Sequence, residues 1–276
     1  MRAMRRFFDF YLDASVHVAL AVVALYGQTL LTFNITANPK VSGFLFCATI
    51  VCYNFMKYGV EAEKYVLVSN TYHRIIQAFS FLAFLGCLYF FWHLDLRLWI
   101  CILILTLVSA LYAIPFLPGF KNLRSLGGMK VFLVAFVWVG LTLVVPFVDV
   151  QLPIHGGFYS AAAIRFLLVV VLILPFEIRD LRVDESSLRT LPQQFGVRRT
   201  KLLGYGLVTL MVFIFILTAP SVNEALHFSM LCVFLLLGLY FSSERNTKYY
   251  AGFWIESIPI AWWLLGLIML RYQLPF

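Results

Sequence analysis

The stretch from Pro175 to Lys201 concentrates charged residues whose spacing could support chemistry. Its sequence is PFEIRDLRVDESSLRTLPQQFGVRRTK. If an α-helix continues through its first half, Glu177, Asp180 and Asp184 lie at i, i+3 and i+7 and share one face. Three carboxylates on one face repel one another, so the arrangement requires a compensating cation. Mg²⁺ meets this requirement, because it combines one or two carboxylates with waters and substrate phosphates.

Arginines alternate with these acids and follow them closely. They are Arg179, Arg182, Arg189, Arg198 and Arg199. Carboxylates for a metal and guanidinium groups for phosphate oxygens are together what a diphosphate-bearing substrate requires. From spacing alone, two interpretations remain open: a metal–diphosphate site, and a solvated helix end whose acids pair with its own arginines.

The composition places this charged stretch at the edge of a lipid bilayer. Hydrophobic residues make up 62% of the 276 residues and charged residues 12%, whereas soluble domains carry roughly 25% charged residues. A membrane-spanning helix needs about 20 apolar residues. Nine stretches meet this requirement: 14–33, 41–58, 75–93, 97–117, 130–148, 158–176, 202–219, 225–242 and 252–270. We therefore predict an all-α, polytopic membrane protein with about nine transmembrane helices, forming a single domain over residues 1–276.

The lysines and arginines lie almost entirely on one side of this predicted bundle. If the N-terminus is cytoplasmic, only Lys40, Arg97 and Arg271 lie outside. The cytoplasmic side holds seventeen: Arg2, Arg5, Arg6, Lys57, Lys64, Arg74, Lys121, Arg124, Lys130, Arg179, Arg182, Arg189, Arg198, Arg199, Lys201, Arg245 and Lys248. Because cytoplasmic loops are enriched in Lys and Arg, we predict a cytoplasmic N-terminus and an outer C-terminus. The same loops account for the net charge of +8, so we expect no nucleic-acid partner.

Arg165 and Glu256 are ionisable residues within apolar stretches. Such residues are unfavourable in a bilayer and usually face an interior cavity. Their positions along the two stretches put them at different depths, so we expect no direct pair. We expect Glu256 to face the same cytoplasmic cavity as Asp180. The alternative for Glu256, a snorkelling or protonated side chain at the interface, remains open.

The segment from Glu177 to Gly196 resembles the second aspartate-rich motif of the UbiA superfamily of membrane prenyltransferases. That motif has an acid or Asn, then Arg-Asp, three residues, a second Asp, and shortly afterwards Arg-Thr-Leu-Pro and Gly. The matching residues are Glu177, Arg179, Asp180, Asp184, Arg189, Thr190, Leu191, Pro192 and Gly196. The family's loop after the fourth helix, with Tyr-x-x-Pro and basic residues, is matched by Tyr112, Pro115, Lys121, Arg124 and Lys130. The resemblance covers the whole chain and extends to UbiA-like proteins of Bacteroidota, which implies a bacterial cytoplasmic membrane.

The resemblance implies a bundle of nine helices whose active site opens at the cytoplasmic face. It implies transfer of a prenyl group from a prenyl diphosphate to a lipophilic or aromatic acceptor within the bilayer, with Mg²⁺ as cofactor. Asp180 and Asp184 would hold the metal together with Glu177, and Asn54 would assist. The residues that would bind the diphosphate are Lys57, Lys121, Arg124, Arg182 and Arg189.

The first motif of the family is largely missing from this chain. Its pattern, Asn-Asp-x-x-Asp-x-x-x-Asp, falls on the segment that begins at Asn54, where Phe55, Tyr58 and Ala62 replace the three aspartates. Lys57 could attract phosphate as a point charge without providing metal geometry. The alternative function is therefore a catalytically inactive UbiA-like protein that binds lipid or serves in assembly. A small transporter ranks below both, because the sequence shows no two related halves.

Overall fold

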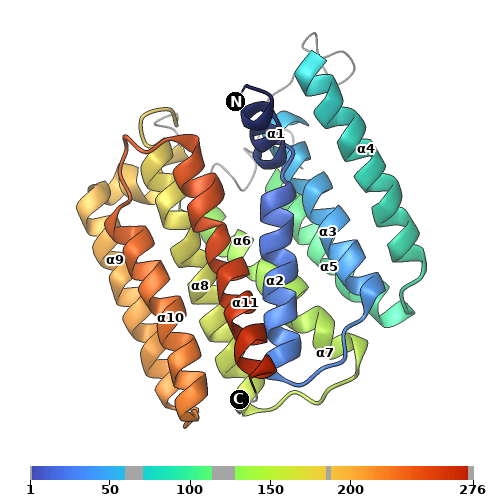
Figure 1. The fold of residues 1–276 in the computed structure, drawn as a ribbon, viewed down its shortest axis with the longest axis vertical. Coiled ribbons are helices and arrows are strands. Elements are labelled where there is room, and N and C mark those ends of the chain that lie inside the picture. The colour runs from blue at the N-terminus through green and yellow to red at the C-terminus, as the bar shows by residue number, and fades with distance from the viewer. Residues whose placement is uncertain (1, 60–70, 114–127, 185–187, 273–276) are drawn as a thin grey trace.

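A computed structural model describes residues 2–59, 71–113, 128–184 and 188–272. Helices and the loops that connect them make up this part of the molecule. No strand occurs in these ranges (Figure 1). The α-helices are α1 (Arg2–Asp13), α2 (Val16–Thr32), α3 (Pro39–Asn54), α4 (Thr71–Trp92), α5 (Leu96–Ala113), α6 (Met129–Val139), α7 (Val145–Asp149), α8 (Gly156–Asp180), α9 (Leu191–Ile216), α10 (Val222–Tyr240) and α11 (Ser257–Arg271). Three π-helical turns interrupt them: η1 (Phe55–Gly59), η3 (Gly140–Val144) and η5 (Tyr250–Ile255). The predicted all-α class is confirmed.

The length and apolar character of these helices define an integral membrane protein. Within the described ranges, seven helical segments are long and apolar enough to cross a bilayer, and the bent pair α1–α2 makes eight if it is one span. A further apolar helix, Leu96–Ala110, is shorter. The polytopic membrane fold is confirmed, and the count of nine stays a prediction.

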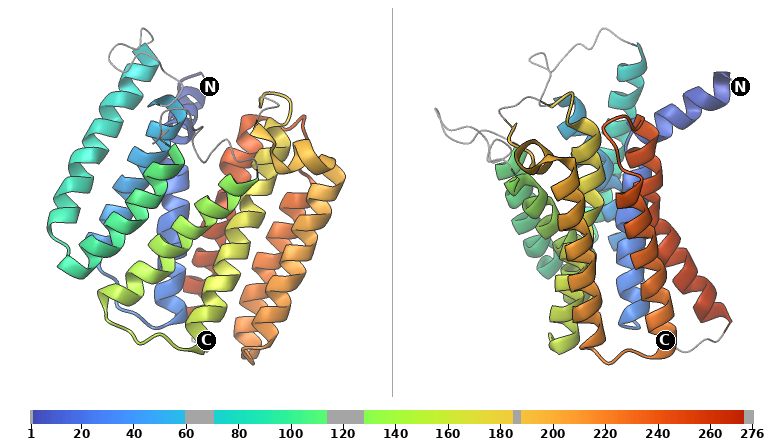
Figure 2. Two further views of the ribbon diagram at one scale, coloured as in Figure 1. Left: turned by 180° about the vertical axis from the view of Figure 1, so that it is seen from behind. Right: turned by 90° about the vertical axis from the view of Figure 1, so that its left-hand side faces the viewer.

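The first helix leaves the bundle at an angle. The axes of α1 and α2 differ by 57°, and Ser15 between them adopts a left-handed φ of 60°. Figure 2 shows α1 projecting sideways from the end of the bundle where α2 begins. Met4 and Phe7 are exposed on it. This bend brings the last residues of α1 beside the mouth of the cavity described below.

The helix α2 occupies the centre and packs against both α3 and α11, while α8 packs against α6 and α9. Small residues permit the close approaches. A Cβ atom at Gly27 would lie 2.5 Å from Nε1 of Trp263 on α11, and one at Gly43 would lie 2.5 Å from the ring of Phe90 on α4. Such glycines let membrane helices pack backbone against side chain.

A buried arginine joins the middle of the bundle. The Arg165 guanidinium donates hydrogen bonds to the Leu25 carbonyl (2.8 Å), Oγ1 of Thr142 (2.8 Å) and Oγ1 of Thr29 (3.2 Å). These groups on α2 and η3 satisfy a cation that would be unfavourable in lipid. Arg165 is thereby committed to a structural contact away from Glu256.

The connection between α8 and α9 organises the charged end of the bundle. The helix α8 ends at Asp180, so the helical face predicted to run through Asp184 stops short. The turn that follows keeps Asp184 nearby, because its N–H donates to the Asp180 carbonyl (2.8 Å). At the start of α9, Oε1 of Gln193 accepts from the Thr190 N–H (2.9 Å), and Gly196 bends the helix with a φ of 77°. Residues of the Arg-Thr-Leu-Pro…Gly segment thus determine the backbone conformation at the start of α9.

Candidate functional site

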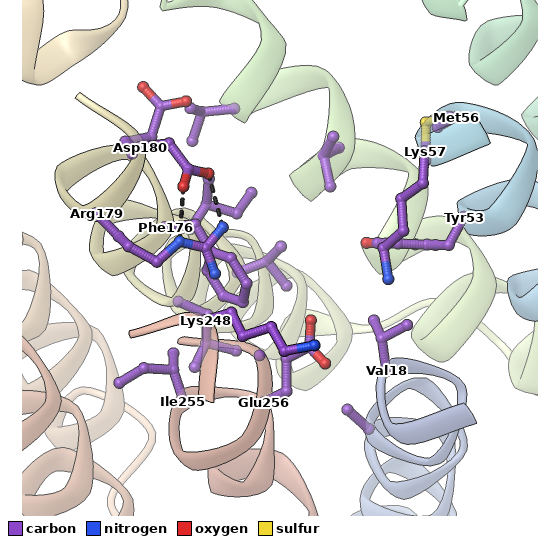
Figure 3. Close-up of a pocket in the computed structure, with 18 of the residues that line it drawn as sticks. Val18, Tyr53, Met56, Lys57, Phe176, Arg179, Asp180, Lys248, Ile255 and Glu256 are labelled. Carbon is purple, nitrogen blue, oxygen red and sulfur yellow. Dashed lines mark hydrogen bonds and ion pairs between the residues drawn. The ribbon is translucent and has the colours of Figure 1, made fainter. Parts of the chain in front are cut away.

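A cavity of about 550 Å³ opens at the end of the bundle that contains the aspartates. It lies between α2, η1, α6, α8 and the η5–α11 segment (Figure 3). Its charged lining residues are Asp13, Lys57, Lys130, Glu177, Arg179, Asp180, Asp184, Lys248 and Glu256. Apolar residues complete the wall, among them Val18, Val134, Trp138, Leu172 and Pro259. The cavity therefore offers one compartment to a ligand with a charged group and an apolar body.

Asp180 is held by its neighbour in the chain. The Arg179 guanidinium donates from Nε to Oδ1 (2.6 Å) and from an Nη to Oδ2 (2.8 Å), as the dashed lines in Figure 3 show. Arg179 itself lies over the ring of Phe176, 5.3 Å from its centroid. The Asp180 side chain is 34% exposed, so a ligand in the cavity can reach it. Bidentate pairing fixes the orientation of the carboxylate.

Glu177 has a different environment from Asp180, although both lie on α8. Its side chain is only 2% exposed, and Oε1 lies 2.5 Å from Nζ of Lys130 on α6. Oε2 accepts a hydrogen bond from the Leu191 N–H at the start of α9 (3.3 Å). A negative charge at this N-terminal end interacts favourably with the helix dipole. Glu177 thus joins three helices, and Lys130 already supplies its counter-charge.

The wall that corresponds to the missing first motif carries Lys57. Its Nζ donates to the Leu12 carbonyl (3.3 Å) and to Oγ of Ser15 (3.0 Å), next to the bend between α1 and α2. Asn54 is buried and does not line the cavity. Its amide donates to the Ala14 carbonyl (3.2 Å) and to Oγ of Ser80 (2.8 Å).

Lys248 closes the cavity from the loop after α10. Its Nζ lies 2.9 Å from Oδ1 of Asp9 and 3.2 Å from Oδ2 of Asp13. Burial alone would lower the pKa of Lys248, but the hydrogen bonds and negative charge of the two aspartates raise this pKa above its usual value. Lys248 therefore stays charged and ties α1 to the mouth of the cavity.

Arg182 and Arg189, which the sequence also places in the site, do not line the cavity. Arg182 is 60% exposed and pairs with Glu244 (3.0 Å), and Arg189 is exposed with a φ of 44°. Lys121 and Arg124 fall outside the residues that the structure describes.

The sequence interpretation did not assign three charged lining residues to the site: Asp13, Lys130 as the partner of Glu177, and Lys248. All three lie at the edges of apolar stretches on the side predicted to be cytoplasmic. That shared position was a signal. It was too common among the charged residues of this chain to select these three.

Asp180 and Asp184 are the carboxylates that could contribute to a metal site shared with a phosphate ligand. In the described part of the chain, no group of three or more His, Cys, Asp or Glu residues is placed to hold a metal ion. Asp180 and Asp184 nevertheless line one cavity. Two carboxylates are enough for Mg²⁺ when waters and phosphate oxygens complete its octahedron.

A second, almost wholly apolar cavity of about 430 Å³ adjoins the first. It lies among α3, α4, α5 and α6, and the two cavities share Tyr53, Met56 and Trp138. Nε1 of Trp138 donates to the Tyr53 hydroxyl (3.1 Å), so the shared wall is itself held in place.

Comparison with known structures identifies the fold. The chain is similar to a UbiA homologue from Archaeoglobus fulgidus bound to DMAPP and Mg²⁺, with a TM-score of 0.61, 12% identity, and coverage of 95% of this chain and 99% of that one. The same homologue bound to GPP and Mg²⁺ has a TM-score of 0.60 and 13% identity, with coverage of 95% of this chain and 99% of that one. A structure reported for digeranylgeranylglyceryl phosphate synthase has a TM-score of 0.56 and 12% identity, with coverage of 96% of this chain and 99% of that one.

No protein-family model and no curated protein matches the sequence. The structural similarity therefore carries the assignment, and at this level of identity it establishes the fold. The chain has the fold of these UbiA homologues, as the resemblance of its second motif predicts.

Proposed function

We propose that this protein is a membrane prenyltransferase, which moves a prenyl group from a prenyl diphosphate to a lipophilic or aromatic acceptor. The observation that carries the proposal is the cavity that joins Asp180, Asp184 and several cations to an apolar wall. A UbiA homologue of the same fold was solved with DMAPP and with GPP, each together with Mg²⁺. A diphosphate with an isoprenoid tail matches both halves of the lining.

The diphosphate would lie against the end of α8. Asp180 and Asp184 would hold Mg²⁺, which would neutralise the charge that develops on the leaving diphosphate. Arg179 orients Asp180, and Lys57 adds positive charge to the opposite wall. Glu177 is 2% exposed and paired with Lys130, whereas Asp180 stays 34% exposed despite its pairing with Arg179, so we assign the metal to the two aspartates alone.

The other polar residues predicted from the motif would act around this centre. Arg182 and Arg189 would attract the substrate at the rim, since neither lines the cavity. Lys121 and Arg124 keep the phosphate-binding role that the resemblance implies. Asn54 would support the wall behind Lys57 through its hydrogen bonds to the Ala14 carbonyl, in the bend between α1 and α2, and to Ser80 on α4.

The prenyl chain would occupy the apolar cavity beyond Tyr53 and Trp138. Burial of isoprenoid carbons there contributes favourable free energy, about 25 cal/mol per Å² of apolar surface. We place the protein in a bacterial cytoplasmic membrane, with the N-terminus and the charged cavity on the cytoplasmic side and the C-terminus outside. Soluble prenyl diphosphates would then reach the site from the cytoplasm.

The second candidate is a UbiA-like protein that binds a prenylated lipid without catalysis. Two observations favour it: the aspartates of the first motif are replaced, and Asn54 does not line the cavity. Such a protein would bind the same ligand and release no diphosphate.

Binding of geranylgeranyl diphosphate with Mg²⁺ to purified Asp180→Asn and Asp184→Asn variants tests the proposal. Loss of one charged interaction, about 1.5–3 kcal/mol, weakens binding about 10- to 100-fold. The matched control is Glu224→Gln, in the first turn of α10 and away from the cavity, which should bind as the wild type does. Unchanged affinity in both aspartate variants would contradict the assignment.

A further inference from the structure

Glu256 is a carboxylate in the cavity that the metal and diphosphate roles leave unused. It lies at the junction of η5 and α11, and Figure 3 shows it extending into the cavity from a different element than Asp180 or Lys57. Among the described residues its carboxylate makes no hydrogen bond and no ion pair. Lys57, Arg179 and Tyr11 interact with it electrostatically.

The backbone holds Glu256 in place by two devices. Its N–H donates to the Ala251 carbonyl, five residues earlier (3.3 Å), which closes the π-helical turn η5. On either side of Glu256, the Phe253 carbonyl and Oγ of Ser257 both contact Nε2 of His17 on α2 (3.0 Å each). Nδ1 of His17 contacts the Tyr11 hydroxyl (2.6 Å), so the imidazole donates toward the turn that bears Glu256.

The position of Lys57 repeats this pattern on the opposite side. It lies within the π-helical turn η1 and lines the same cavity as Glu256. π-helical turns are rare and recur at functional sites. Two such turns therefore place the Glu256 carboxylate and the Lys57 ammonium group in one cavity without joining them in an ion pair.

A role in metal binding does not fit this placement. Glu256, Asp180 and Asp184 all belong to the described residues, yet these residues contain no group of three acids placed to hold a metal. The groups near Glu256 are instead two cations, the Tyr11 hydroxyl and the apolar Ile255 and Pro259. A carboxylate with compensating charge, a free oxygen and apolar surroundings is suited to accept a proton from a lipophilic ligand.

We propose that Glu256 is the general base of the transfer reaction and that the acceptor presents a hydroxyl group to it, as a lipophilic alcohol or phenol does. This inference rests on the proposed prenyltransferase function. The C1–O bond of the prenyl diphosphate breaks, and its electron pair leaves with the diphosphate. The acceptor oxygen forms the new bond to C1, and its proton passes to the Glu256 carboxylate and then to solvent.

Geranyl diphosphate with ¹⁸O at the bridging oxygen separates ionisation from capture, with water as the hydroxyl nucleophile. Reversible ionisation moves the label to non-bridging positions, whereas capture yields geraniol and diphosphate. Glu256→Gln should keep the rate of label exchange within about twofold and lower geraniol formation about 10²-fold or more, the usual contribution of a general base. Glu256→Asp should recover part of this loss, and Glu224→Gln should match the wild type.

The outcomes distinguish the two proposals. Equal capture by Glu256→Gln and the wild type would overturn the base. A parallel fall of label exchange and capture would also overturn it, because Glu256 would then serve ionisation. A wild-type protein that shows neither exchange nor capture would overturn the prenyltransferase function itself.

Discussion

The buried pair of Lys130 and Glu177 gives a quantitative test of the site's architecture. Lys130→Met leaves the Glu177 carboxylate, which is 2% exposed, with the Leu191 N–H as its one remaining partner in the described part of the chain. Removing one member of a buried ion pair costs about 3–5 kcal/mol. Glu177→Met should cost less, about 1–3 kcal/mol, because the Lys130 side chain is 18% exposed and can turn toward water in the cavity.

The double variant Lys130→Met with Glu177→Met distinguishes pairing from simple packing. It removes both charges and keeps two unbranched apolar chains, so it should be more stable than Lys130→Met alone. The expected loss is about 1–2 kcal/mol, for the lost N–H bond and helix-dipole interaction. Reversible unfolding in mixed micelles with SDS measures the free energies. Additive losses from the two single changes would refute the coupling, and Glu177 would again be available as a metal ligand.

Three further predictions concern topology, charge and the core. A reporter fused after Lys201 should be cytoplasmic and one fused beside His155 should lie outside; protease protection of both on one side would contradict the orientation. Lys57→Ala should weaken geranylgeranyl diphosphate binding about tenfold in a titration, because it removes a cation that lines the cavity, while Lys40→Ala should not. Arg165→Met should destabilise the protein by about 2–5 kcal/mol, since its three hydrogen bonds contribute about 0.6–1.7 kcal/mol each in membrane proteins; a thermal-stability assay that shows no loss would refute this.

The helical fold followed from the sequence because apolar length alone determines which segments enter a bilayer. The stretch 130–148 appears as a nearly continuous helical segment, Lys130–Asp149. Its internal division into α6, η3 and α7 was not predictable. Neither was the bend after α1, where Ser15 takes a left-handed conformation. Such irregularities depend on packing between helices, which hydropathy does not record.

The site was predictable where neighbours in the chain decide the geometry, and less so where distant helices do. Asp180 and Asp184 lie in one cavity, although the turn after α8, and not the predicted helical face, keeps Asp184 there. Spacing along α8 could not show that Lys130 from another helix neutralises Glu177. Glu256 lines the same cavity as Asp180, as expected from the sequence, but the π-helical turn that precedes it was not predictable. Sequence patterns define a helical face, and the fold decides what that face meets.

Release of diphosphate from geranylgeranyl diphosphate by the purified wild-type protein tests the central claim most directly. The measurement compares release with and without added Mg²⁺, with Asp180→Asn as the matched inactive variant. We predict release that depends on Mg²⁺ and is lost in the variant. Wild-type protein that binds the ligand and releases no diphosphate with Mg²⁺ would contradict the claim and favour a lipid-binding protein without catalysis.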